Sequence, residues 1–285
     1  MTWLSIALVG IGVGDVIRST SWRPGRVVAH VIAPVAIVAL GLLAGMSSLA
    51  DWLALAFAAA AGASWAELSR HTQMTGRRAL AGLACFAVIV VGLLAFSGAA
   101  SPAAGPLSTW LHWADLPGNG SLAPGRVLLL AGLAFFNVAT ANTIVRLVLL
   151  AIGALRPSDV TDANTAAAAA ASRAGQPAPP TTGQPADRLK GGRLLGPMER
   201  LVILGLGLAG EFGAAGLVIA AKGLLRFPEI QAAARGANGN PANPTDPSGA
   251  AYQGGPAGID DVTEYFLVGS FVSWLIALGS LALTA

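Results

Sequence analysis

Residues 194–227, LLGPMERLVILGLGLAGEFGAAGLVIAAKGLLRF, decide the fold class of this chain. An α-helix needs about 20 apolar residues to cross a bilayer, and this run is longer than that, with Glu211 near its middle. A charged side chain at the centre of a bilayer is costly, so it marks the first place to look for function. The run therefore predicts a membrane-spanning helix that carries a functional carboxylate.

The composition of the whole chain agrees with a membrane protein. The 285 residues are 54% hydrophobic and 11% charged, whereas soluble domains carry about 25% charged residues. The net charge of +3 comes from basic residues scattered among loops, so we expect the lipid bilayer and not a nucleic acid as partner. The first apolar run has no basic segment before it and is predicted to be a retained helix, not a removed signal peptide.

Seven apolar segments predict an all-α, polytopic transmembrane helix bundle of about seven spans. The first and third are marginal as spans, which leaves six spans as the alternative. The segments are Thr2–Ile17, Val27–Met46, Leu49–Leu68, Ala79–Gly98, Val127–Leu155, Met198–Leu225 and Thr263–Ala285.

The distribution of basic residues predicts the topology. Loops one, three and five, together with Arg200, hold twelve of the 17 Lys and Arg residues, the alternate loops hold four, and Arg146 lies inside the fifth span. The positive-inside rule then puts the N-terminus outside and the C-terminus in the cytoplasm. The abundance of Ala, Gly and Arg is typical of GC-rich bacterial genes, so we expect a multi-pass protein of the inner (cytoplasmic) membrane.

Composition also divides the chain into parts. Residues 1–155 form a predicted N-terminal bundle of five spans. Residues 156–191 form an Ala/Pro-rich cytoplasmic linker predicted to be disordered, and 192–285 a two-span hairpin with a Gly/Asn/Pro-rich outer loop at 232–258. Trp110 and Trp113 predict a short interfacial helix in the loop before the fifth span, because Trp prefers the headgroup level.

Glu211 has a candidate partner at similar depth. Arg146 lies about nine residues from the inner end of the fifth span, Asn142 is one turn away, and Glu211 is similarly deep in the sixth. We expect Glu211, Arg146 and Asn142 to form an intramembrane polar cluster, as an ion pair that holds the bundle together or as a proton or cation site. On the opposite face of the sixth span, small residues predict close helix packing: Gly205, Ala209, Gly213, Gly216 and Ala220.

Asp15 and His30 form a weaker candidate pair near the inner ends of the first two spans. A His–carboxylate contact there can relay protons or simply hold the helices together. No sequence motif of a hydrolase, a nucleotide-binding loop or a metal site occurs, so no catalytic residue is assigned and we expect no metal and no cofactor.

Three motifs resemble an uncharacterised family of bacterial integral membrane proteins, classed only as a domain of unknown function. They are Gly-x-Leu-Leu-Gly-x-x-Glu-Arg at 192–200, Ala-Ala-Lys-x-Leu-x-Arg-Phe at 220–227 and Glu-Tyr-x-x-x-Gly-Ser at 264–270. Members often carry His-x-x-x-Asp in the first span, where this chain has Ile11 in place of the His. The resemblance covers mainly residues 192–270 and draws attention to Glu199, Arg200, Lys222, Arg226, Phe227, Glu264 and Tyr265.

Three functions are compatible with these observations. The first is a non-enzymatic packing or partner-binding component of the bacterial cell envelope, which binds another membrane protein or a second copy of itself. The second is a small transporter or channel for protons or cations that uses Glu211 with Arg146. The third is a membrane enzyme acting on lipids, which the absence of a recognisable nucleophile disfavours.

Overall fold

The computed structural model describes residues 1–19, 25–114, 123–155, 157, 192–224 and 259–284. Within these ranges every regular element is a helix, which confirms the all-α class. Three of the described helical stretches are long and apolar enough to cross a membrane: Thr2–Ser19, Leu49–Thr75 and Pro124–Ala151.

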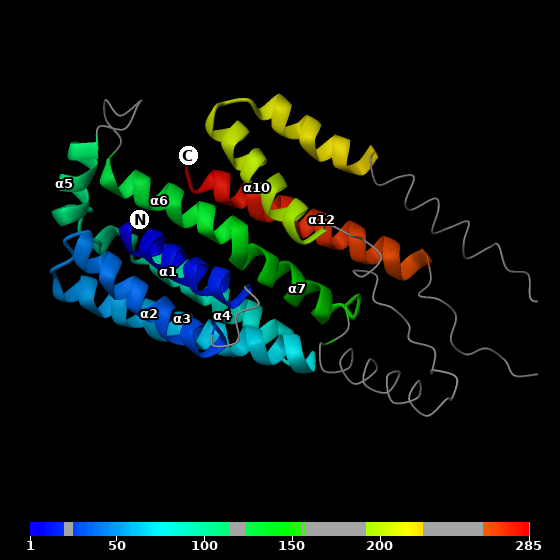
Figure 1. Ribbon diagram of the computed structural model, residues 1–285, viewed down its shortest axis with the longest axis horizontal. Helices are drawn as coiled ribbons and strands as arrows, with labels where there is room; N and C mark the ends of the chain where they lie inside the picture. Colours follow the sequence, from blue (N-terminus) through cyan, green and yellow to red (C-terminus); the bar gives the residue numbers. More distant parts are fainter. Residues whose placement is uncertain (20–24, 115–122, 156, 158–191, 225–258, 285) are drawn as a thin grey trace, which may run out of the picture.

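Helix α1 (Thr2–Ser19) lies at the centre of the bundle, and most of its residues are buried. It packs against α2 (Gly25–Leu43), α3 (Leu49–Thr75), α4 (Ala79–Ala95) and α6 (Pro124–Phe135), whose axes run roughly side by side (Figure 1). A Cβ at Gly132 of α6 would lie 2.9 Å from the backbone oxygen of Ser5. The glycine therefore allows the two backbones to approach more closely than any larger residue would.

One end of the bundle carries the short helices η1 (Ser97–Ala99) and α5 (Gly105–Ala114). Helix α5 confirms the predicted short helix before the fifth apolar segment. Trp110 and Trp113 on it are 52% and 81% exposed.

The fifth apolar segment forms one continuous rod of three helices. It comprises α6, the π-helix η2 (Phe136–Thr140) and α7 (Ala141–Ala151), 28 residues in all. At about 1.5 Å per residue, this rod is longer than the hydrocarbon core of a bilayer is thick.

The sixth apolar segment does not form one span, so this prediction was wrong. It folds into α10 (Gly192–Leu208) and a second helix, Phe212–Leu224, which we call the second arm. Gly210 adopts φ +81° at the break, a left-handed conformation that favours glycine and ends a helix. The second arm runs back along α10, and the Nζ of Lys222 lies 2.5 Å from the Oε2 of Glu199. Figure 1 shows the two arms, in yellow, joined by this turn.

The hairpin changes the relation between the two ends of the chain. Helix α12 (Ile259–Ala282) packs against α10 and α7 and ends beside the hairpin turn. Figure 1 marks both ends of the chain at the same end of the bundle, where α5 also lies. The structure does not confirm the prediction of termini on opposite sides, because the hairpin adds a reversal of direction that the apolar run does not reveal.

Two predicted segments fall on residues that the structure leaves undescribed. The linker at 156–191, apart from Pro157, and the outer loop at 232–258 both lie outside the described residues.

Candidate functional site

The π-helix η2 interrupts the longest rod of the bundle and carries polar side chains into its core. Asn137 and Thr140 of η2 are buried, as is Thr143 at the start of α7. A π-turn disturbs the regular pairing of backbone groups, so carbonyl oxygens become available to other donors, and such turns are frequent at functional sites. Here the backbone oxygen of Asn137 accepts a hydrogen bond from Arg200. The π-turn thus creates an acceptor for a buried cation.

Arg200 of α10 is the largest charged side chain in the core, with an exposed fraction of 2%. Its Nε donates to the Asn137 oxygen at 3.0 Å, its Nη1 to the Oγ of Ser273 at 2.8 Å and its Nη2 to the Oδ1 of Asn142 at 2.5 Å. In the part of the chain that the structure describes, no carboxylate lies within salt-bridge distance of Arg200. Neutral acceptors from η2, α7 and α12 therefore compensate for the burial of this charge.

Asn137 extends the same cluster toward the end of α12. Its Nδ2 donates to the backbone oxygen of Leu133 at 2.8 Å and to the Oγ of Ser280 at 2.9 Å. Its Oδ1 and the Oγ1 of Thr140 are both buried without a hydrogen-bond partner in the described structure. Unsatisfied buried atoms are uncommon in folded proteins, and both of these lie on η2.

The predicted cluster of Glu211, Arg146 and Asn142 is only partly right. Asn142 does bind a guanidinium, but that group belongs to Arg200. Arg146 is exposed on α7, and Glu211 is exposed at the hairpin turn, where its backbone oxygen accepts from the amide of Ala215. The physical reason is the break at Gly210, which takes Glu211 out of the middle of a helix.

The face assignment of the sixth segment was also wrong. Ala215 and Val218 of the second arm pack against Ile203 of α10, together with Ile219. The predicted small-residue ridge instead faces outward, since Gly205, Ala209, Gly213, Gly216 and Ala220 are all exposed.

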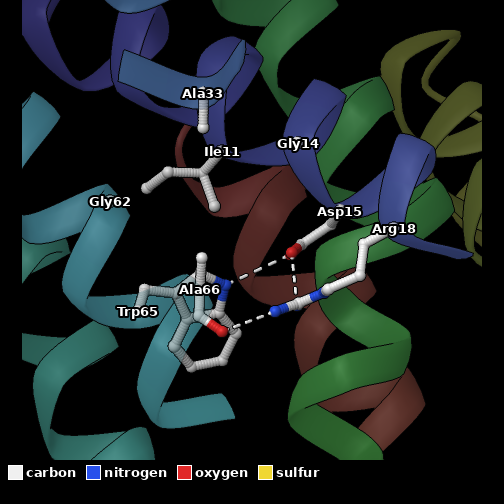
Figure 2. Close-up of a pocket in the computed structure, with 8 residues that line it drawn as sticks. All are labelled: Ile11, Gly14, Asp15, Arg18, Ala33, Gly62, Trp65 and Ala66. Atoms are coloured by element: carbon white, nitrogen blue, oxygen red, sulfur yellow. Dashed lines mark hydrogen bonds and ion pairs between the residues drawn. The ribbon is translucent and has the colours of Figure 1, made fainter. Parts of the chain in front are cut away.

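A second buried cluster lies where α1 meets α3, and Figure 2 shows its side chains pointing toward one another. Asp15 accepts from the Nη2 of Arg18 at 2.5 Å and from the Nε1 of Trp65 at 3.2 Å. The Nη1 of Arg18 donates to the backbone oxygen of Ala66 and to the Oγ of Ser69, both at 2.8 Å. The cavity beside this cluster measures about 10 Å³, which is room for a single water.

The predicted pair of Asp15 and His30 is wrong. The Nε2 of His30 lies 3.1 Å from the Oε2 of Glu67, which also binds Arg70. Asp15 instead turns inward to Arg18 and Trp65. Both residues are near the same end of the bundle, but they face different neighbours.

Asp51 forms a third cluster, which the sequence analysis missed. This fully buried carboxylate accepts from the Nε1 of Trp3 at 2.7 Å and the Oγ of Ser101 at 2.7 Å, and it forms a capping box with Ser48. Three parts of the chain thereby meet at the end of the bundle that holds the N-terminus. The spacing Ser-x-x-Asp before an apolar run was the signal that could have found it.

The structure places the residues singled out by the family resemblance in different settings, and some of them lie outside what it describes. Glu199 and Lys222 form the ion pair between the two arms, and Arg200 forms the buried cluster. Arg226 and Phe227 lie outside the described residues. Glu264 and Tyr265 belong to α12, but their side chains are outside what the structure describes. Among the described residues no group of three His, Cys, Asp or Glu side chains lies close enough to hold a metal ion.

Chemically, the three clusters can join helices through charge-assisted hydrogen bonds, which are stronger than neutral ones. Searches of protein-family models, of curated proteins and of solved structures find no match to this chain. The resemblance to a family of unknown function therefore stays a prediction.

Proposed function

We propose that the chain is an integral protein of the bacterial inner membrane and that it serves as a non-enzymatic packing or partner-binding component of the cell envelope. Large apolar side chains on the outer surface support a location in lipid. Val35 of α2, Leu80 and Val91 of α4, and Phe271 of α12 are each more than half exposed. Exposed apolar surface of this extent is unfavourable in water and costs nothing in hydrocarbon.

The use of the buried polar groups supports a structural role over catalysis. Arg200, Asp15 and Asp51 each bind side chains of neighbouring helices. The cavity beside Asp15 has room for about one water, so a substrate could not reach this carboxylate.

The hairpin suggests a simple topology. With the hairpin entering and leaving at one membrane face, the basic residues at that face are the eleven of the odd loops together with Lys222, Arg226 and Arg235, while Arg200 is buried inside α10. Arg126 is then the single basic residue of the segments at the other face. The positive-inside rule favours this arrangement, with the basic face in the cytoplasm and both termini outside.

The observation that carries the partner-binding proposal is the outer face of the second arm. Gly213 and Gly216 are exposed, and a Cβ at either position would meet nothing within 4 Å. Phe212 and Leu217 beside them are 65% and 72% exposed. In membranes, small residues at helical spacing are typical of helix–helix interfaces, because they let two backbones approach closely. We infer that this face binds a helix of another membrane protein or of a second copy of the chain.

The substitution Gly216→Ile tests this proposal in the full chain. The added side chain has room in the isolated fold, so folding should be unchanged while close approach of a partner helix is blocked. Gly279→Ile on α12 is the matched control, because this glycine is also helical, exposed and free of neighbours within 4 Å.

The measurement is native gel mobility and chemical crosslinking in membranes. We expect a complex larger than the monomer for the wild type and for Gly279→Ile, and its loss for Gly216→Ile. A monomer in all three samples, or equal complexes in all three, would exclude the second arm as the interface.

A second candidate function is the transport of protons or cations, and the unsatisfied Asn137 Oδ1 and Thr140 Oγ1 on η2 favour it. Buried oxygen atoms without donors are suitable acceptors for a transient proton carrier or ion. In reconstituted liposomes, this function requires a flux that Asn137→Leu abolishes in a folded protein and that Glu211→Gln leaves intact, because Asn137 carries a free buried oxygen and Glu211 is exposed at the turn. Absence of flux in the wild type would leave the non-enzymatic role.

A further inference from the structure

A cleft of about 380 Å³ opens at the end of the bundle where both termini lie. The start of α6, the end of α10, the start of the second arm and the end of α12 surround it. Its lining includes one charged side chain, one hydroxyl that donates to the backbone oxygen of Leu281, and otherwise apolar groups: Arg126, Thr284, Gly207, Phe212, Leu278 and Leu281. None of the polar atoms of the three buried clusters belongs to a residue that lines the cleft, although Phe212 at its edge also borders the proposed partner-binding face.

The walls of the cleft suit a hydrocarbon chain. Phe212 and Leu278 are 65% and 46% exposed, so their apolar surfaces are free to contact a ligand. Gly207 contributes to the shape, since a Cβ there would lie 2.5 Å from the Cδ2 of Leu281. A site with apolar walls and one polar group at its rim is the usual design for an amphiphilic ligand.

Arg126 supplies the polar group. Its side chain is exposed in the first turn of α6, and within the described ranges no carboxylate forms a salt bridge with it. The positive end of the α6 dipole adds to its attraction for an anion. Helix α5, with its two exposed Trp side chains, lies at the same end of the bundle and marks the depth of lipid headgroups (Figure 1).

We propose that this cleft binds one phospholipid with a net negative headgroup, the phosphate against Arg126 and an acyl chain along Leu278 and Leu281. No carboxylate lines the described cleft, so a headgroup ammonium finds no partner there, and a zwitterionic lipid gains less than an anionic one. Free inorganic phosphate would leave the apolar walls unused. The inference rests on the proposed membrane location but not on the proposed partner.

Native mass spectrometry of the full chain in detergent tests this site. The probes are dioleoyl phosphatidylglycerol and dioleoyl phosphatidylcholine, which share acyl chains and differ in net charge. We expect the wild type to retain one phosphatidylglycerol molecule. Arg126→Gln should bind it about tenfold more weakly, and this decrease in affinity corresponds to the loss of one charge-assisted hydrogen bond. Arg77→Gln, which removes an exposed arginine beyond the far end of α3, should bind as the wild type does.

Two further variants separate the two halves of the site. Arg126→Lys keeps the charge and should restore most of the binding. Leu278→Trp fills the cleft from an exposed position and should weaken both lipids. Helical circular dichroism and thermal unfolding of each variant check that the fold is kept.

Equal phosphatidylglycerol binding by the wild type and Arg126→Gln would overturn the proposal, as would equal loss with Arg126→Gln and Arg77→Gln. Undiminished binding by Leu278→Trp would also overturn it. The oligomeric state and the resistance to alkaline extraction from membranes are measured on the same proteins. A failed lipid site is thereby distinguished from a failed partner interface or a wrong location.

Discussion

The Nη2 of Arg200 donates to the Oδ1 of Asn142 across 2.5 Å and so joins α10 to α7 inside the bundle. The same guanidinium reaches Ser273 of α12 and the backbone of η2. One side chain therefore connects the last part of the chain to the first. A buried charge that binds only neutral acceptors depends on each of its hydrogen bonds. Losing any one of them leaves the charge less compensated and so lowers the stability of the fold.

Replacing Arg200 with Met should destabilise the fold strongly. The substitution keeps an unbranched apolar stem but leaves Asn142, Ser273 and the Asn137 oxygen without their donor, at a cost of about 3 kcal/mol in the free energy of unfolding. Arg200→Lys should recover part of this, since an ammonium cannot make the same forked contacts. Unfolding in mixed detergent, followed by circular dichroism, gives the values. An effect below that of the exposed control Arg77→Met would contradict the buried role of Arg200.

Replacing Glu211 with Gln should change little. Its side chain is exposed at the hairpin turn, and surface substitutions are usually within about 0.5 kcal/mol of neutral. The same unfolding measurement checks this. A loss of stability similar to that of Arg200→Met would show that Glu211 is buried and would restore the prediction made from the apolar run.

Both termini should react from the same side of the membrane. With Cys85 changed to Ala, single cysteines at Gly98 and Thr284 probe the end with the termini, and one at Thr75 probes the opposite end. A membrane-impermeant maleimide applied to intact cells should label Cys at 98 and 284 alike and spare the one at 75. Opposite labelling of positions 98 and 284 would mean that the sixth segment crosses the membrane once.

Replacing Asp51 with Ala should loosen the end of the bundle that carries α5. The change leaves the indole N–H of Trp3 and the hydroxyl of Ser101 without their acceptor, which costs about 2–4 kcal/mol. Asp51→Asn retains one acceptor oxygen and should cost less. Tryptophan fluorescence during thermal unfolding reports on both variants. If Asp51→Ala unfolds at the same temperature as the wild type, the cluster contributes nothing to stability.

The sequence predicted the apolar helices well, because lipid imposes a simple requirement of length and composition. It missed the hairpin because a single charged residue, Glu211, leaves the mean hydropathy of the run high, and because Ala209 and Gly210 continue the small-residue pattern; the positive φ of Gly210 reveals the turn. In the proposed topology, Lys222 joins the membrane face that carries most of the basic residues.

The candidate site was also harder to predict, because the undetected hairpin changes which residues of the sixth segment face the other helices. Asn142 was identified correctly as a polar residue facing another helix, but its partner depended on which residue of the sixth segment lies opposite. Arg200 was counted with the basic residues of the loops because the sixth apolar segment was predicted to begin at Met198, whereas α10 begins at Gly192 and buries Arg200. A π-turn has no reliable sequence signature, so the role of Asn137 was not predictable.

The contact of Arg200 with η2 has a practical consequence for how the gene can be divided. Residues 1–157 and 192–285 meet through non-covalent bonds that run from Asn137 to Arg200 and Ser280. Two polypeptides translated separately in one cell should therefore recognise each other and assemble. Such fragment complementation would make the chain usable as a split reporter and would allow each half to be varied by recombination.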